Sequence, residues 1–270
     1  MSDWSSSQRV EPGHPASLAA RDPDDQLGFT EKASAREQLD MLRDELGTLH
    51  DRLWAEAARG VLLVLQGMDT AGKDGAIKRV VRGLNPQAVQ VVAFKAPAEN
   101  ERAHDYLWRA HAQCPPRGRL GVFNRSHYED VVAALLVGAV DRAAVERRYR
   151  HLCEFERMLV DEGTTLVKVF LHISRDEQRA RLQARLDDPT KRWKFKLDDL
   201  ETRSHWDEYQ AEYERTITAT STEWAPWHVV PANRKWVRDV AVATLLLETL
   251  RALDPQYPPP APELDGVVVD

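Results

Sequence analysis

The sequence has few cysteines, since only Cys114 and Cys153 occur among its 270 residues. Two isolated thiols exclude a disulfide framework and a cysteine-rich metal site. The chain also lacks an apolar run near the roughly 20 residues that span a bilayer. Its start, MSDWSSSQRVEPGHP, lacks the apolar segment of a signal peptide. These absences predict a soluble, cytoplasmic protein with no membrane partner.

An excess of positive charge is missing as well, because the formal net charge at pH 7 is −6. General binding of nucleic acid is therefore not expected. A hydrophobic content of 43% over this length is enough for one α/β domain with a sizeable core. We expect that domain at residues 33–253, between a loose polar arm at 1–32 and a Pro-rich tail at 254–270.

Short apolar segments alternate with helical patterns along most of the chain. The expected strands are 60–67, 89–94, 120–126, 164–174 and 227–232, and the expected helices are 33–58, 76–85, 99–114, 128–137, 141–161, 175–188 and 234–252. This alternation predicts a three-layer α/β/α fold with a parallel five-stranded sheet, whose ligand lies at the carboxyl ends of the strands. The charged segment 187–214 interrupts the alternation and is expected to be a helical lid; a surface hairpin is the alternative.

The stretch GMDTAGKDGA, residues 67–76, nearly matches the phosphate-binding pattern G-x-x-x-x-G-K-S/T. The strand before it and the helix after it supply the required context. The N–H groups of the loop and of the helix start are expected to hold phosphate. The expected phosphate contacts are Ala71, Gly72, Lys73, Asp74 and Gly75.

Two carboxylates set this loop apart from the usual pattern. Asp74 stands where a Ser or Thr hydroxyl normally holds Mg²⁺, and an acidic residue there also simply suits the first turn of a helix. Asp69 lies inside the loop, where phosphate repels it unless a cation lies between them. We therefore assign Asp69 to Mg²⁺ or to activation of the acceptor phosphate, with an ordinary turn residue as the alternative.

A second acidic stretch, FNRSHYED at 123–130, follows the third expected strand. The position that normally carries a metal-binding aspartate holds Asn124, so the metal is assigned to Glu129 and Asp130 instead. Arg125 lies at the strand tip and is expected to contact phosphate and act in catalysis together with Asp69 and Lys73. The alternative is a plain helix start, because Ser126 and Glu129 match a capping box.

Basic residues form two runs that flank the phosphate loop. A solvated helix face is the simpler interpretation of any single one. Two runs around one cradle nevertheless indicate a ligand with more negative charge than one nucleotide carries. The candidates for phosphate contact are Lys78, Arg79, Arg82 and Lys95 on one side, and Arg179 and Arg185 on the helix at 175–188.

Taken together, several motifs in order resemble the polyphosphate kinase 2 family. They are GMDTAGKDGAIK, FKAP, PPRG, FNRSHYEDV, WKF and WAPWHVVPANRKW, and the FNRSHYED version resembles the class III members. The resemblance covers about residues 33–252. It implies a thymidylate-kinase-like P-loop fold with a lid. It also implies Mg²⁺-dependent transfer of the terminal phosphoryl group of inorganic polyphosphate to AMP and to ADP, which yields ATP.

The resemblance also has implications for single residues and for assembly. The essential aspartate and lysine of the family's loop match Asp69 and Lys73, and its lid arginines are placed on Arg179 and Arg185. The family commonly reads F-D-R-S where this chain has Asn124, which is a departure. Family members form homodimers or homotetramers, often through the N-terminal helix, here 33–58.

Three other interpretations fit the sequence less well. An ATP-dependent nucleoside monophosphate kinase of the thymidylate kinase type also carries an aspartate in the loop, but it keeps a Ser or Thr where this chain has Asp74. A nucleotide-binding switch needs a metal-binding aspartate at the end of the third strand and an N-K-x-D motif, and the sequence has neither. Nucleic-acid binding through the basic runs lacks an evident aromatic stacking platform.

Overall fold

The computed structural model describes residues 4–269, and their centre is a six-stranded sheet of order β1-β6-β5-β2-β4-β3. Its strands are β1 (Arg9–Val10), β2 (Gly60–Gln66), β3 (Val89–Ala93), β4 (Leu120–Asn124), β5 (Thr164–His172) and β6 (Trp227–Pro231). Strands β2 to β6 are all parallel. The parallel five-stranded sheet is thus confirmed, and β1 adds an antiparallel edge strand next to β6.

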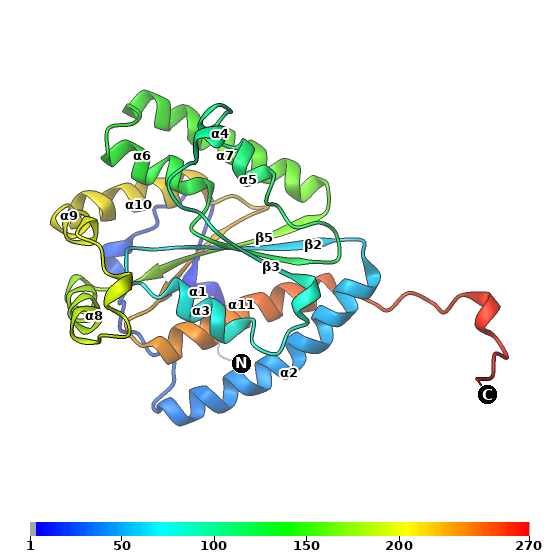
Figure 1. Cartoon of the computed structure of the whole chain (residues 1–270). Coiled ribbons are helices and arrows are strands. Elements are labelled where there is room, and N and C mark those ends of the chain that lie inside the picture. Colours follow the sequence, from blue (N-terminus) through cyan, green and yellow to red (C-terminus); the bar gives the residue numbers. More distant parts are fainter. Residues whose placement is uncertain (1–3, 270) are drawn as a thin grey trace.

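Helices cover both faces of the sheet, which confirms the three-layer α/β/α prediction (Figure 1). One face carries α2 (Lys32–Glu56), α3 (Lys73–Val80) and α11 (Lys235–Leu253), and the other carries α6 (Val132–Leu136) and α7 (Arg142–Asp161). Every residue of β2 is buried. Burial on both faces explains why this strand reads GVLLVLQ, without the alternation of a half-exposed strand.

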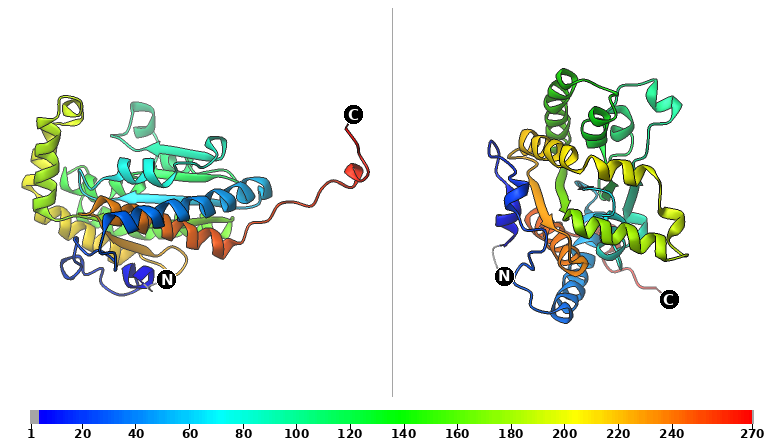
Figure 2. Two further views of the ribbon diagram at one scale, coloured as in Figure 1. Left: turned by 90° about the horizontal axis from the view of Figure 1, so that it is seen from below. Right: turned by 90° about the vertical axis from the view of Figure 1, so that its left-hand side faces the viewer.

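Three further helices lie across one end of the sheet, as the right-hand view of Figure 2 shows. They are α8 (Arg175–Asp187), α9 (Asp198–Ser204) and α10 (Trp206–Thr220). The segment 187–214 is therefore helical, as expected. The phosphate loop, Arg125 and the start of α8 follow β2, β4 and β5 and meet at this same end, because parallel strands share the edge where they finish.

The expectation of a loose arm at 1–32 is wrong for residues 4–32. This stretch forms α1 (Trp4–Gln8), β1 and the 3₁₀ turn Leu18–Ala20. Val10, Ala16 and Leu18 are at most 3% exposed. Few apolar residues are enough to anchor it, because β1 pairs with the otherwise open edge of β6. Residues 1–3 of the expected arm lie outside the described part.

Two expected helices also differ from what the structure contains. The helix expected at 99–114 is broken into α4 (Glu99–Arg102) and α5 (Trp108–His111). Asp105 causes the break, because its Oδ1 accepts from the N–H groups of Leu107 and Trp108 at 3.0 and 3.1 Å and starts a new helix. The helix expected at 128–137 is a 3₁₀ turn, His127–Asp130, followed by α6.

Short 3₁₀ turns complete the chain at Pro86–Ala88, Arg192–Lys194 and Pro262–Leu264. The C-terminal segment runs away from the domain after α11 (Figures 1 and 2). Its residues 256–269 are exposed, in line with the expected tail, of which Asp270 lies outside the described part. No helix in the described part of the chain is long and apolar enough to cross a membrane.

Candidate active site

The phosphate loop has the backbone conformation that an anion cradle requires. Gly67, Thr70 and Gly72 have φ angles of 148°, 66° and 103°. A Cβ atom at Gly67 would lie 2.8 Å from the carbonyl oxygen of Leu171, so only glycine fits there. Helix α3 begins at Lys73, and the N–H groups of its first turn have no intrahelical acceptor. They are the donors that a phosphate oxygen would use.

Ala71 differs from the other expected phosphate contacts. Its N–H donates to the carbonyl oxygen of Met68 at 3.0 Å, inside the loop. The loop therefore uses this donor to hold its own shape. A contact of Ala71 with phosphate stays a prediction, as do the contacts of Gly72, Asp74 and Gly75.

Lys73 lies folded back over the loop. Its side chain is buried, and its Nζ donates to the carbonyl oxygens of Gly67 at 2.6 Å and Met68 at 3.3 Å. Burial and the neighbouring guanidinium of Arg125 lower the pKa of Lys73 from 10.5 to about 8. A bound phosphate would stabilise the ammonium, so this lysine is arranged to gain charge stability when an anion arrives.

Arg125 joins the two predicted acidic positions. Its Nη2 donates to Asp69 Oδ1 at 2.6 Å, and its Nη1 lies 3.5 Å from Glu129 Oε2. The carboxylates of Glu129 and Asp69 raise the pKa of Arg125 against the effect of burial. The residue has a φ of 62°, and its N–H donates to the carbonyl oxygen of Leu65 on β2. The sequence prediction that these side chains lie around one crevice agrees with this geometry.

Asn124 also takes part in the site. Its Nδ2 donates to Asp74 Oδ1 at 2.7 Å, and Lys194 of the segment 187–214 lies 3.6 Å from the other oxygen of Asp74. Burial acts to raise the pKa of Asp74, but the Asn124 hydrogen bond and the Lys194 charge outweigh it, so the pKa is lowered. An aspartate at position 124 would instead place two carboxylates side by side.

Asp130 does not lie with Asp69 and Glu129 on Arg125. Its carboxylate accepts from Arg109 Nη2 at 2.8 Å, and its carbonyl oxygen accepts from Arg148. The Arg109 side chain is only 5% exposed and also donates to the carbonyl oxygen of Lys95 at 2.8 Å. Sequence reasoning missed Arg109, whose pairing occupies Asp130; a metal role for Asp130 stays a prediction without geometric support.

The turn that carries Glu129 is capped differently from the expected capping box. Ser126 Oγ accepts from the N–H of Tyr128 at 3.2 Å, while Glu129 leaves its carboxylate to other partners. With the Gln66 amide oriented to satisfy its neighbours, Gln66 Nε2 donates to Glu129 Oε1 at 3.0 Å. Glu129 is therefore held from two sides, by Gln66 and by Arg125.

Arg181 holds the loop from behind; it belongs to the basic run on the helix expected at 175–188 but was not predicted as a site residue. Its Nη1 donates to the carbonyl oxygens of Thr70 at 2.9 Å and Ala71 at 3.0 Å, and its Nη2 donates to that of Asn233 at 2.8 Å. Burial lowers its pKa. Spacing along α8 could have found it, because Gln178, Arg181 and Arg185 recur at intervals of three and four and share one helix face.

Arg238 and Thr70 complete the missed residues around the loop. A Cβ atom at Gly72 would lie 2.0 Å from Arg238 Nη1, so the guanidinium fills the space that this glycine leaves. The hydroxyl of Thr70 is buried and has no hydrogen-bond partner among the described residues. An orphaned hydroxyl within a phosphate loop is a donor left for a ligand oxygen.

The segment 187–214 contacts the loop through a short relay. Arg203 Nη1 donates to Gln178 Oε1 at 3.1 Å, and Gln178 Nε2 donates to the carbonyl oxygen of Asp69 at 3.2 Å. Burial and the charge of Asp69 raise the pKa of Asp199. Burial and then Glu129 raise the pKa of Tyr213 on α10. The helices at this end of the sheet therefore form a wall of the site.

The predicted basic contacts are spread over several surfaces. Lys78, Lys95 and Arg179 are exposed. Arg185 lies 3.7 Å from Asp199, within the wall. Arg82 faces a hollow beside α2 with several aspartates, whereas Arg79 lines a second hollow between α2 and α11. Phosphate contacts of all six stay predictions.

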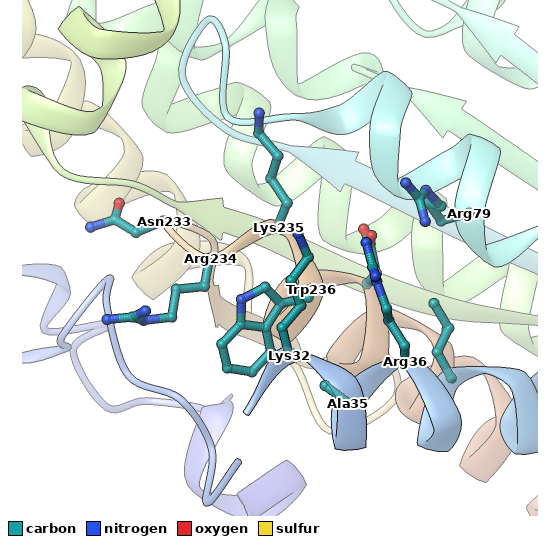
Figure 3. A pocket seen from close by; sticks show the side chains of 10 residues that line it. Lys32, Ala35, Arg36, Arg79, Asn233, Arg234, Lys235 and Trp236 are labelled. Carbon is teal, nitrogen blue, oxygen red and sulfur yellow. The ribbon is translucent and has the colours of Figure 1, made fainter. Parts of the chain in front are cut away.

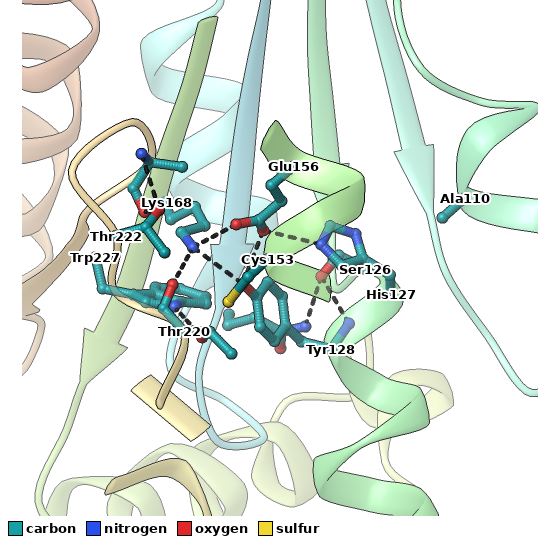
Figure 4. A network of polar contacts seen from close by, with 12 residues as sticks. Ala110, Ser126, His127, Tyr128, Cys153, Glu156, Lys168, Thr220, Thr222 and Trp227 are labelled. Carbon is teal, nitrogen blue, oxygen red and sulfur yellow. Dashed lines mark hydrogen bonds and ion pairs between the residues drawn. The ribbon is translucent and has the colours of Figure 1, made fainter. Parts of the chain in front are cut away.

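A buried polar network supports the turn that bears Glu129 (Figure 4). Glu156 of α7 accepts from Tyr128 Oη at 2.7 Å and from Lys168 Nζ at 2.6 Å, and His127 Nε2 lies 3.1 Å away. Lys168 also donates to the carbonyl oxygen of Thr220 at the end of α10. Lys168 and His127 outweigh burial and lower the pKa of Glu156. Strand β5, α7 and α10 are thereby tied to the segment after β4.

The donor set near the loop fits Mg²⁺ when phosphate is present. The described residues contain no group of three or more His, Cys, Asp or Glu that could hold a metal by themselves. Mg²⁺ prefers hard oxygen ligands and is usually held by one or two carboxylates together with phosphates and water. Asp69 and Glu129, less than 20% exposed and sharing Arg125, provide such a pair.

A phosphate loop at the end of β2, a lysine over it and a helical wall across it define a P-loop phosphotransferase. A family model described as polyphosphate kinase 2 matches residues 29–258, and the chain belongs to that family.

Similar proteins agree with this assignment. The chain is 51% identical over 263 residues to the AMP/ADP-polyphosphate phosphotransferase of Meiothermus ruber, covering 97% of this chain and 98% of the relative. It is 42% identical to the ADP-polyphosphate phosphotransferase of Rhodopseudomonas palustris over 81% of this chain and 80% of that protein. The crystal structure of polyphosphate kinase 2 from Arthrobacter aurescens TC1 has a TM-score of 0.90 and 47% identity, and covers 94% of this chain and 91% of its own.

Proposed function

We propose that this chain transfers the terminal phosphoryl group of inorganic polyphosphate to AMP and to ADP, so that two successive transfers produce ATP. The observation that carries the proposal is Arg125, which bridges Asp69 and Glu129 beside a phosphate loop that has no hydroxyl after Lys73. The missing hydroxyl, whose place is taken by Asp74, distinguishes the site from that of an ATP-dependent nucleoside monophosphate kinase. The names of the relatives from Meiothermus ruber and Rhodopseudomonas palustris support the substrates.

The transfer proceeds in line, with no covalent enzyme intermediate. The first-turn N–H groups of α3 and the ammonium of Lys73 hold the terminal phosphoryl group of the donor. Arg125 leaves its carboxylates to contact the equatorial oxygens as charge develops on them. An oxygen of the acceptor phosphate attacks the phosphorus, and the shortened chain leaves on the opposite side.

Asp69 and Glu129 would hold Mg²⁺, which shields the negative charges of donor and acceptor when it is bound. The relay from Arg203 through Gln178 fixes the backbone of Asp69. The helices α8 to α10 act as a lid that excludes water from the site.

The test is an ATP assay with AMP, long-chain polyphosphate and Mg²⁺ as the only reactants. We expect ATP from the wild type and a loss of kcat of about 100-fold or more in Asp69→Asn, the size seen when one electrostatic contact to a transition state is removed. Asp265→Asn is the matched control, because Asp265 lies in the C-terminal segment that runs away from the domain (Figure 1).

Other outcomes would change the assignment. ADP without ATP would limit the protein to the first transfer. Turnover with ATP as the donor and none with polyphosphate would replace the proposal by a nucleoside monophosphate kinase. Assembly into a homodimer or homotetramer also stays a prediction, which native mass spectrometry of the purified chain can test.

A further inference from the structure

A hollow of 360 Å³ with a cationic lining lies between α2, α3 and α11 (Figure 3). Its lining includes five cationic side chains: Lys32 and Arg36 from α2, Arg79 from α3, and Arg234 and Lys235 at the start of α11. Sequence analysis singled out only Arg79. So many cations in one hollow are unexpected in a chain whose net charge is −6.

Four of these five cations have no ion-pair partner among residues 4–269. Lys32, Arg36, Arg79 and Lys235 form no ion pair with any carboxylate of residues 4–269, while Arg234 pairs with Asp24 at 2.9 Å. The one acidic side chain in the lining, Asp239, is buried against Arg238, whose Nε donates to it at 2.9 Å. The hollow therefore has four cations that are not held in an ion pair, and such a cluster favours a multiply charged anion.

The hollow is adjacent to the phosphate loop. Arg181 donates from one guanidinium to the carbonyl oxygens of Thr70 in the loop and of Asn233 in the hollow's lining. Arg79 follows Lys73 by six residues on α3, which is about 9 Å along a helix. Burial and the charges of Arg181 and Arg238 lower the pKa of Lys235 against the opposing charge of Glu177, as expected where several cations lie close together. A chain held at the loop could thus continue into the hollow.

We propose that this hollow binds phosphates of the donor chain that lie beyond its reacting end, and so gives the enzyme its grip on long chains. The inference rests on the proposed function, since it assigns a subsite for the same donor. Trp236 also lines the hollow, where it contacts the Phe29 ring edge-on and adds an apolar surface without charge. Phosphate oligoanions are the ligand class because only they extend from the loop while carrying charge on every unit.

The experiment compares long-chain polyphosphate with tripolyphosphate as donor and as ligand. The double variant Lys32→Ala/Arg36→Ala removes two exposed cations one helical turn apart, and Lys235→Ala removes one from α11. Arg147→Ala/Arg150→Ala on α7 is the matched control, because α7 covers the opposite face of the sheet (Figure 1). Calorimetric titration without nucleotide gives the affinity, and steady-state kinetics give KM.

We expect the affinity of the α2 double variant for long-chain polyphosphate to fall about tenfold, the sum of two exposed ion pairs. The ratio of its long-chain KM to its tripolyphosphate KM should rise by a similar factor, and the control should keep the wild-type ratio. An equal loss for both ligands would assign the hollow to a separate small phosphate anion and overturn the proposal. An unchanged ratio would overturn it as well.

Failure of the proposed function would look different. In that case the wild type would transfer no phosphoryl group from either polyphosphate, whatever the variants bind. A wild type that is active with polyphosphate, beside variants that match the control, would contradict the subsite alone.

Discussion

Lys73 shows how a single residue is prepared for its ligand. It is buried among loop carbonyls and beside Arg125, and its pKa is lowered to about 8. The free enzyme therefore loses this charge above about pH 8. A bound phosphate restores the ammonium by stabilising its charged form. The pH dependence of binding and the pH dependence of turnover should consequently differ.

We expect kcat/KM for polyphosphate to fall as pH rises through about 8, because kcat/KM reports ionisations of the free enzyme. The corresponding fall in kcat should come at higher pH. In Lys73→Arg, whatever its absolute activity, the fall of kcat/KM near pH 8 should be absent, since a guanidinium stays charged. Initial rates from about pH 6 to about pH 10 give both profiles. A fall at the same pH in Lys73→Arg would assign the ionisation to another group.

The sign of the same shift applies to stability. The folded pKa of Lys73 is about 8, against 10.5 as the ordinary value, so the unfolded chain keeps the proton over that interval after the folded chain has lost it. The contribution of Lys73 to the free energy of unfolding therefore rises with pH between these values.

Among single residues, the sequence predicted those site residues that lie at or just after the end of a strand. Asp69, Lys73 and Arg125 each end or follow a strand, so their shared edge could be predicted from the parallel order. The roles of Arg109 and Arg238 could not be predicted. Arg109 pairs with Asp130 from another element, and Arg238 pairs with its neighbour Asp239 but fills the space beside Gly72, which is far away in sequence.

At the scale of elements, the N-terminal stretch is hydrogen-bonded to the C-terminal half of α10. Glu214 of α10 accepts from the N–H groups of Ser17 and Leu18, both at 2.6 Å, and Thr218 accepts from that of Ala16 at 2.9 Å. These hydrogen bonds hold residues 16–18 against the C-terminal half of α10. The stretch therefore acts as a strap on α10.

Glu214→Ala should lower the free energy of unfolding by about 1.5–3 kcal/mol, because it removes a charged acceptor from two backbone donors. Urea unfolding followed by circular dichroism measures the change. Glu208→Ala, on the same helix but paired only with His205 at the surface, should stay near the wild type. Equal losses in the two variants would show that the strap contributes nothing beyond helix propensity.

The elements that sequence reasoning misplaced are those that depend on a partner. Strand β1 has two residues, which is too short for any periodic signal, and it exists because the edge of β6 is open beside it. The break between α4 and α5 had a local signal, the Asp105 side chain as a helix start, but an uninterrupted helical pattern of polar residues outweighed it. The long central strands could be predicted because their burial on both faces gives continuous apolar runs in the sequence.

At the scale of the whole molecule, the ion pair of Lys168 and Glu156 joins β5 of the sheet to α7. Both side chains are completely buried. Lys168→Met would leave the Glu156 charge without its ammonium partner, and we expect a loss of about 3–5 kcal/mol in the free energy of unfolding. Lys196→Met, at an exposed position, is the matched control. Replacing both partners, as Glu156→Leu/Lys168→Met, should recover part of the loss.

The pH dependence of this contribution has a definite sign. The pKa of Glu156 is lowered in the folded protein, so its stabilising effect is present above the ordinary pKa of a glutamate and is lost as pH falls through the lowered value. Unfolding curves of the wild type and Lys168→Met should therefore converge in acid. A constant gap down to low pH would contradict the assigned ionisation.

The bridge of Arg125 has a consequence for the order in which ligands gather. A carboxylate oxygen that accepts from a guanidinium at 2.6 Å is not free for a cation, so Asp69 would become a full ligand of the proposed Mg²⁺ only as Arg125 turned to phosphate. In the proposed mechanism, binding of the polyphosphate donor would free Asp69 for Mg²⁺, and binding of Mg²⁺ would free Arg125 for the donor. Each ligand would therefore raise the affinity of the site for the other by the same factor. A single side chain, Arg125, would thereby couple the binding of the two ligands. Either ligand alone would have to compete with the ion pairs that Arg125 forms with Asp69 and Glu129.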